Sequence, residues 1–249
     1  MLWIAAAALC AACAAGCGGA RTPSARAPSA PAARRCVAGA ERSVGSLRTA
    51  VAAIVERPTT AFRVPGHGRI ARFGRMNVNH VPTVFGVLSE RVSSDCSAEW
   101  LHVALPMRPN GITGWIRARD VRRAVVHTRI AVDLSQRRLR LYRNGRLLLR
   151  SVVAIGSRAT PTPLGRYYVN QRLIPSDPTG PYGPGAVGIS AFSPVLTGWA
   201  LGGPVAIHGT NEPWSIGRAV SNGCIRLPNS VLRRVFAEAL AGTPVVITA

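Results

Sequence analysis

The stretch Ser221-Asn222-Gly223-Cys224-Ile225-Arg226, with His208-Gly209-Thr210 before it, is the most informative part of the chain. A thiol becomes a strong nucleophile when a neighbouring group takes its proton, and a histidine within reach is the usual one. His208 follows the apolar run Pro204-Val205-Ala206-Ile207, which is typical of a strand. We therefore expect Cys224 to be a nucleophile and His208 its base, both at the edge of a sheet.

The residues around the cysteine suit the same chemistry. Gly223 permits a tight turn, because glycine adopts backbone conformations that other residues avoid. The N–H groups of Gly223 and Cys224 are then candidate donors to an oxyanion, and Ser221 can hydrogen-bond within the turn. In a strand Arg226 would share a face with Cys224, where it would stabilise the thiolate or bind a substrate carboxylate. A single cysteine or histidine is often structural, so the prediction depends on their joint occurrence.

Composition gives broader limits. The chain has 249 residues, enough for two domains beside a leader and a linker. Its 31 basic residues, all arginine, outnumber 10 acidic residues and give a net charge of +21. Two explanations stay open: an anionic partner such as a cell envelope, or a GC-rich coding sequence. The arginines are scattered and form no recognised reader motif, so we expect no nucleic-acid partner.

The N-terminal cysteines lie in an apolar leader. Residues 2–16 are too short to span a bilayer and are typical of a signal peptide. The following Ala14-Ala15-Gly16-Cys17 resembles a bacterial lipobox, which predicts lipidation at Cys17 and a membrane anchor. An ordinary cleaved signal peptide is the alternative. Either way the protein is expected to be exported to the cell envelope.

Export bears on the three cysteines beyond the leader. Thiols outside the cytoplasm tend to oxidise in pairs, and an odd number leaves one thiol over. Because Cys224 belongs to the motif, Cys36 and Cys96 are the natural pair. We therefore expect a Cys36–Cys96 disulfide.

The mature chain divides by its patterns into a linker and two mainly-β domains. Residues 1–35 comprise the leader and an Ala-, Pro- and Arg-rich linker, and 36–125 a first domain. A helix is expected over 41–56, with Val44, Leu47 and Val51 on one face. From 61 to 123 short β segments follow, and Asn110-Gly111 predicts a hairpin turn. The paired Trp100 and Trp115 segments resemble the last hairpin of a bacterial SH3-like barrel.

The second domain, 126–249, is also expected to be β-rich. Segments 130–134, 139–142, 147–155, 204–207 and 245–247 have the composition of strands. Residues 156–198 are rich in glycine and proline and are expected to be loops. A helix is predicted over 231–240, with Asn229 or Ser230 as its cap and Gly242 ending it.

At the motif the chain resembles a known family. His208-Gly209-Thr210 followed by Ser221 to Leu227 is similar to the signature of the L,D-transpeptidase (YkuD-type) catalytic domain. Thr160-Pro161-Thr162-Pro163-Leu164-Gly165 and Tyr182-Gly183-Pro184 resemble two further stretches of that family. The resemblance covers about residues 129–249. It implies a mixed β-sheet sandwich, following the small SH3-like barrel, with one or two short helices.

The resemblance also implies a reaction. Cys224 would attack the bond between the third and fourth residues of a peptidoglycan stem tetrapeptide, releasing D-alanine and passing the acyl group to an amine. His208 would be the base, oriented by the carbonyl of Gly209, while Thr210, Tyr182 and Arg226 would bind substrate. No metal or cofactor is implied, and carbapenem-type inhibitors are expected partners. Many members have histidine where this chain has Asn222, so a second role for that histidine is in doubt.

Other functions remain as alternatives. A sortase-like transpeptidase also uses cysteine, histidine and arginine, but its arginine lies well downstream of the cysteine. A papain-like peptidase places its cysteine before its histidine, and no histidine follows Cys224. A zinc site would need more ligands at suitable spacing. A non-catalytic wall-binding lipoprotein stays open, as does the identity of the acyl acceptor: a stem peptide, a protein amine, a D-amino acid or water.

Overall fold

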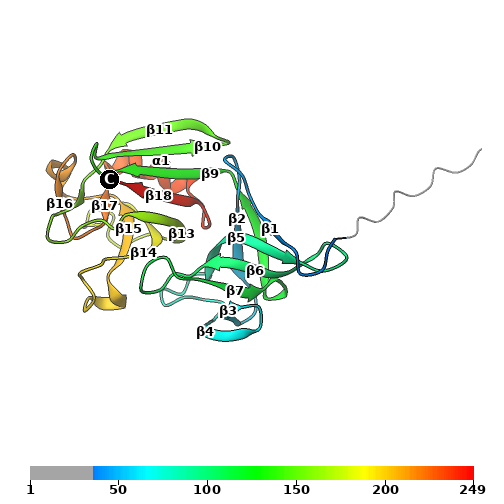
Figure 1. Ribbon diagram of the computed structural model, residues 1–249. Coiled ribbons are helices and arrows are strands. Elements are labelled where there is room, and N and C mark those ends of the chain that lie inside the picture. Colours follow the sequence, from blue (N-terminus) through cyan, green and yellow to red (C-terminus); the bar gives the residue numbers. More distant parts are fainter. Residues whose placement is uncertain (1–35) are drawn as a thin grey trace, which may run out of the picture. The chain divides into compact units, whose positions relative to one another are not determined.

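Two eight-stranded β-sheets make up most of this computed structural model, which describes residues 36–249 (Figure 1). The chain therefore has the mainly-β class predicted from its sequence. Three single turns of 3-10 helix and one α-helix complete the described elements. The 3-10 turns span Ala118–Asp120, Ala200–Gly202 and Pro213–Ser215.

The first sheet is antiparallel and has the order β4-β3-β7-β6-β5-β2-β8, with β1 also pairing with β5. Its core is apolar and includes the fully buried side chains of Phe85, Leu101 and Ile116. The strands are β1 Glu41–Ser43, β2 Ala50–Val55, β3 Thr59–Val64, β4 His67–Phe73, β5 Val84–Val92, β6 Ala98–Ala104, β7 Thr113–Arg117 and β8 Val121–Val126.

The helix expected over 41–56 is wrong, because this segment forms β1 and β2 instead. Gly45 has a φ of +82°, and the Ser46 hydroxyl accepts the N–H of Thr49, so a turn interrupts the segment. The β-branched residues after that turn favour a strand. β2 lies between β5 and β8, whereas Leu47 from the expected apolar face is 79% exposed.

The predicted pairing of the two tryptophan segments is present, but the turn between them differs. β6 and β7 pair antiparallel, with His102 opposite Trp115 and their rings stacked at 4.8 Å. The connection spans 105–112 and is longer than a two-residue hairpin turn. Asn110 instead donates from Nδ2 to the Phe192 carbonyl and accepts the Phe192 N–H at Oδ1, which ties the loop to the second sheet. The SH3-like barrel itself stays a prediction.

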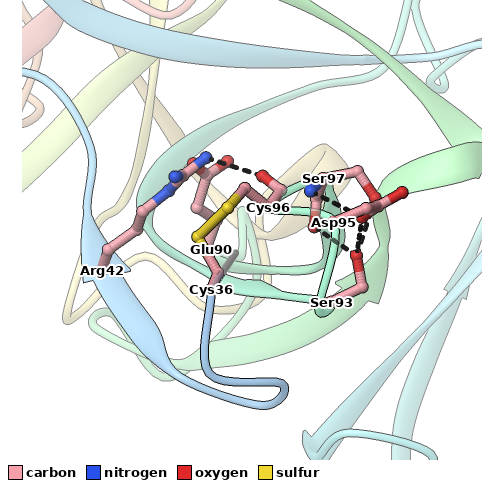
Figure 2. Close-up of a disulfide and its surroundings, with 7 residues drawn as sticks. All are labelled: Cys36, Arg42, Glu90, Ser93, Asp95, Cys96 and Ser97. Carbon is pink, nitrogen blue, oxygen red and sulfur yellow. Dashed lines mark hydrogen bonds and ion pairs between the residues drawn. A yellow bond between two sulfur atoms is a disulfide. The ribbon is translucent and has the colours of Figure 1, made fainter. Parts of the chain in front are cut away.

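A disulfide joins Cys36, which precedes β1, to Cys96, which lies between β5 and β6 (Figure 2). The two cysteines are 60 residues apart in the sequence. Beside the disulfide, the carboxylate of Glu90 accepts from Arg42 Nε at 2.6 Å and from Arg123 at 2.7 Å. These arginines come from β1 and β8, and Glu90 lies on β5. Because the Glu90 side chain is only 6% exposed, its two cationic partners offset the cost of burying the charge.

The second sheet is mixed and has the order β11-β10-β9-β18-β13-β14-β15-β17. β18 is parallel to β9, and β15 is parallel to β17. A separate parallel pair joins β12 to β16. The strands are β9 Thr128–Asp133, β10 Arg138–Arg143, β11 Arg146–Val152, β12 Ile155–Gly156, β13 Gly165–Leu173, β14 Ala186–Phe192, β15 Pro204–His208, β16 Ala219–Ser221, β17 Ile225–Arg226 and β18 Pro244–Thr248.

The expectation of loops over 156–198 is wrong for two long segments. β13 and β14 lie in the middle of the sheet, where β13 pairs with β18 and β14 with β15. Almost all of β14 is buried, so its sequence lacks the alternation of a half-exposed strand. Seven of the 14 glycines and prolines in this range lie in the connection between these strands, residues 174–185.

One α-helix, α1, spans Asn229–Glu238 and packs Leu232 and Val235 into the core of the second sheet. It starts two residues before the predicted position and ends before Gly242. Neither Asn229 nor Ser230 caps it, because the N-cap position is Pro228. No helix in the described range is long and apolar enough to cross a membrane.

Candidate active site

The pairing of β15 with β17 brings the predicted nucleophile and base to one face of the sheet. In this parallel pair Ile207 lies opposite Ile225 and His208 opposite Arg226. The same register places Ala206 beside Cys224, and the Ala206 N–H donates to Cys224 Sγ at 3.4 Å. Side chains two residues apart share a face of a strand. Cys224 and His208 therefore lie diagonally across two adjacent strands, on the same face.

His208 is held in one orientation and is neutral. Its Nδ1 lies 2.6 Å from the Gly209 carbonyl, which can only accept, so Nδ1 carries the proton. The ring of Tyr182 meets the His208 ring edge-on at 5.0 Å. Burial lowers the pKa of His208 to about 4, helped by the charge of Arg226 and opposed by the Gly209 carbonyl. Nε2 is thereby left as a lone-pair acceptor, which is what a general base needs.

The thiol of Cys224 is half-buried and is the free thiol of the described part of the chain. Burial raises its pKa, while the Ala206 N–H and the charge of Arg226 act in the opposite direction. Burial thus favours the neutral form of both the thiol and the imidazole.

The turn before the cysteine is built by Ser221. Its Oγ donates to the Cys224 carbonyl at 2.5 Å and accepts the Gly223 N–H at 3.2 Å. Gly223 has a φ of +107°, which explains the glycine at this position. The expected oxyanion role of the Gly223 N–H is therefore corrected, because this group is used inside the turn. The N–H of Cys224 remains the candidate donor.

Two threonines of the Thr160-to-Gly165 stretch donate hydrogen bonds to carbonyls of this turn. Thr160 Oγ1 donates to the Ser221 carbonyl and Thr162 Oγ1 to the Gly223 carbonyl, both at 2.9 Å. Thr162 is buried and also accepts the N–H of Gly156. In the sequence, this stretch was notable only for its resemblance to the L,D-transpeptidase family. The two hydrogen bonds show what its threonines do, which is to hold the turn before Cys224.

Arg226 shares the face of Cys224, as expected from its position two residues on, but it already has a partner. Its guanidinium forms an ion pair with Glu212, and its Nε is buried without a hydrogen-bond partner in the described part of the chain. Sequence reasoning missed Glu212, which lies in the loop after His208. No local pattern distinguishes it, because the pair depends on the β15–β17 register.

The remaining predicted site residues differ in their access to solvent. Tyr182 and Asn222 are exposed, so both are available to a ligand. Thr210 is buried, its hydroxyl accepts the Glu212 N–H, and its own N–H donates to Asn229 Oδ1 at 2.8 Å. Its predicted contact with substrate is corrected to a role inside the loop. The sequence had suggested Asn229 only as a helix cap, whereas in the structure its side chain binds the loop after His208.

Within residues 36–249, no group of three or more His, Cys, Asp or Glu side chains is arranged to hold a metal ion.

Comparison with known proteins agrees with this geometry. Residues 127–247 match the YkuD family model, described as the L,D-transpeptidase catalytic domain. The matched segment is 121 of the 249 residues, slightly less than half of the chain. We call this part of the chain the YkuD domain.

Two curated relatives of the YkuD domain come from Bacillus. A putative L,D-transpeptidase YkuD of Bacillus licheniformis is 40% identical over 120 residues, which cover 48% of this chain and 65% of the relative. Its counterpart in Bacillus subtilis is 36% identical over 47% of this chain and 64% of the relative. The chain thus spans slightly less than two thirds of the length of these relatives.

Among solved structures, an L,D-transpeptidase from Enterococcus faecium is 27% identical. The match covers 49% of each chain with a TM-score of 0.37.

Proposed function

We propose that this protein is a peptidoglycan L,D-transpeptidase with Cys224 as its nucleophile. The observation that carries the proposal is the placement of Cys224 and His208 on one face of β15–β17, with His208 Nδ1 bonded to the Gly209 carbonyl. That hydrogen bond leaves Nε2 as the proton acceptor beside a protonated thiol. The match of residues 127–247 to the YkuD family model supports the proposed substrate class.

In the first half of the reaction, Cys224 Sγ attacks the carbonyl between the third and fourth residues of a stem tetrapeptide. The thiol proton passes to His208 Nε2 as the S–C bond forms. The tetrahedral oxyanion faces the Cys224 N–H. Collapse breaks the C–N bond, His208 returns the proton to the leaving amine, and D-alanine departs.

In the second half, an acceptor amine attacks the thioester. His208 takes a proton from that amine, and the cysteine leaves as a thiol when the proton is returned to sulfur. One amide bond is exchanged for another, so the reaction needs no external energy source. Tyr182 and Asn222 are exposed beside this centre and are proposed to contact the stem peptide.

Location in the cell envelope is part of the proposal. The leader and Cys17, the predicted lipidation site, lie outside the described residues. The predictions of a signal peptide and of lipidation therefore rest on the sequence alone. A disulfide between Cys36 and Cys96 suits an oxidising compartment. The first domain is proposed to assist binding to the wall.

The test is the intact mass of the protein after incubation with a defined stem tetrapeptide. We expect an adduct equal to the tripeptide acyl group, lost in Cys224→Ala and strongly slowed in His208→Ala. A carbapenem is a second probe, because the catalytic domain of the Enterococcus faecium relative is described as acylated by ertapenem.

Two outcomes would favour the alternatives. A non-catalytic wall-binding protein would bind peptidoglycan equally well as Cys224→Ala and form no adduct. A sortase-like enzyme would form an acyl adduct with a sorting peptide and not with the tetrapeptide. An Asn222→His variant is the matched control for the motif, and it should still form the adduct.

A further inference from the structure

The hairpin of β10 and β11 concentrates positive charge at one end of the second sheet. Residues 137–152 contain six arginines and no acidic residue. They are Arg137, Arg138, Arg140, Arg143, Arg146 and Arg150. In the described part of the chain only Arg143 of these six forms an ion pair, with Glu238 of α1.

The strand register gathers several of these charges on one face. Arg140 lies directly opposite Arg150, and Arg138 lies opposite Val152. The buried residues Leu139 and Leu141 point to the other face, toward the core. Like charges directly opposite each other on a sheet are destabilising. The fold relieves part of this repulsion through the attraction between Asp133 and Arg140 and a hydrogen bond from Arg140 to Gln136 Oε1.

The acidic side chain on this face relieves little of that repulsion. Asp133 of β9 lies opposite Arg138. Its carboxylate already accepts hydrogen bonds from the Ser135 hydroxyl and the Gln136 N–H. The residue opposite Arg140 on β9 is Ala131, and the residue opposite Ala131 on β18 is Val246. Neither side chain carries a charge.

Apolar side chains stand exposed among these arginines. Leu147 lies opposite Tyr142 and is 50% exposed, and Val152 is 41% exposed. β11 is the edge strand, at the opposite end of the strand order from the β15–β17 pair that carries His208 (Figure 1). The chain continues from Val152 to Ala154, whose backbone pairs with Arg226, so the Val152 end of this face approaches the candidate active site.

We propose that the outer face of β10–β11 docks on the surface of an anionic lipid bilayer. The arginines would meet lipid phosphates, while Leu147 and Val152 enter the boundary between headgroups and acyl chains. Arginine suits this position, because its aliphatic stem lies along apolar surface while the guanidinium stays with phosphate. A soluble polyanion would use the charges alone and would leave the exposed leucine and valine without a function.

The test measures vesicle binding of residues 34–249, which form a compact unit of their own and exclude the apolar leader. The vesicles contain phosphatidylglycerol with phosphatidylcholine, or phosphatidylcholine alone. We expect binding only to the anionic vesicles, weakening as salt is added. The triple variant Arg138→Ser, Arg140→Ser, Arg150→Ser should bind about a hundredfold more weakly, from a contribution of roughly fivefold per arginine.

The matched control removes the same charge elsewhere. Arg63→Ser, Arg69→Ser, Arg75→Ser changes three exposed arginines of the first domain that form no ion pair within residues 36–249. This control should lose much less affinity. Equal losses in the two triple variants would overturn the proposal, because they would show that net charge alone drives binding. Absence of binding by the unchanged protein would overturn it as well.

Leu147→Ser separates the bilayer from a soluble polyanion. It should weaken binding to anionic vesicles and leave binding to polyphosphate unchanged. If Leu147→Ser has no effect on vesicles, the face is a site for soluble polyanions and the bilayer proposal is wrong. Thermal melting of each variant checks folding.

Discussion

At the scale of single residues, the chemistry of the site follows from the burial of His208. In the folded chain burial brings its pKa to about 4, compared with 6.5 for an unperturbed histidine. Between these two values the unfolded chain binds a proton that the folded chain does not. The free energy of unfolding must therefore fall as the pH is lowered from about 6.5 to about 4, by about 3 kcal/mol in all.

This linkage predicts a difference between the unchanged protein and His208→Gln. Urea unfolding at pH 7 and at pH 4.5 should show a loss of stability on acidification that is about 2 kcal/mol smaller in the variant. Other titrating groups, such as Asp133 and Asp177, contribute equally to both proteins. An identical pH dependence in the two proteins would mean that His208 is not held neutral by burial.

Residue types and spacing were enough to propose Cys224 and His208 from the sequence, because both are chemically distinctive. The partners that tune them were not predictable in the same way. Glu212 reaches Arg226 only through the β15–β17 register, and the Gly223 N–H is taken by Ser221 only in the folded turn. Such contacts depend on backbone geometry, which residue types alone do not specify.

At the scale of elements, the start of α1 supports the segment that carries the base. Asn229 Oδ1 accepts the N–H of buried Thr210 at 2.8 Å. The same oxygen lies against the Cα faces of Gly183 and Gly209, where any Cβ would collide with it. Asn229 thus supports Gly209, whose carbonyl accepts the hydrogen bond from His208 Nδ1, and the loop that carries Tyr182. This makes Asn229 a positioning residue.

Asn229→Ala should therefore slow alkylation of Cys224 by iodoacetamide at neutral pH by about tenfold, because the base is no longer held in line. Asn229→Asp keeps the acceptor for the Thr210 N–H and should recover most of the rate. Ser230→Ala, at the exposed neighbouring position, is the matched control. A purely structural role would lower the melting temperature of Asn229→Ala and leave the alkylation rate unchanged.

Elements differed in how well their sequences predicted them. Strands with one exposed face, such as β9 and β10, show alternation and were recognised. β14 is buried on both faces, so its sequence does not alternate between apolar and polar residues. The glycines and prolines on either side of it then favoured the prediction of a loop. The segment 41–56 showed apparent helical spacing, yet pairing of β2 with β5 and β8 outweighed that weak local preference.

At the scale of the whole molecule, contacts between the sheets join residues far apart in sequence. Arg108 donates to the carbonyls of Ser193 and Gly202, and Asn77 Nδ2 donates to Gln171 Oε1 at 3.0 Å. Nothing in the local sequence of Arg108 indicates a partner more than 80 residues away. The mainly-β class could be predicted from the sequence, whereas the residues that join the two sheets could not.

The Cys36–Cys96 disulfide acts on the molecule through its unfolded state. A cross-link that closes a loop of this size removes chain entropy worth about 4 kcal/mol, in a model in which the folded state is unstrained. The double variant Cys36→Ser, Cys96→Ser should therefore melt about 10 °C lower. Cys224→Ser, which leaves the disulfide intact, is the matched control and should not show this shift.

The double variant Cys36→Ser, Cys96→Ser also shows whether the disulfide affects only the first sheet or the whole molecule. Cys36 lies just before β1, whose pairing with β5 holds Arg42 against Glu90 (Figure 2). The site around Cys224 draws on β15, β17 and α1, so alkylation of Cys224 well below the melting temperature should keep its rate in the double variant. A slower rate there would mean that loosening the first sheet reaches the catalytic pair, and that the two sheets unfold as one cooperative unit.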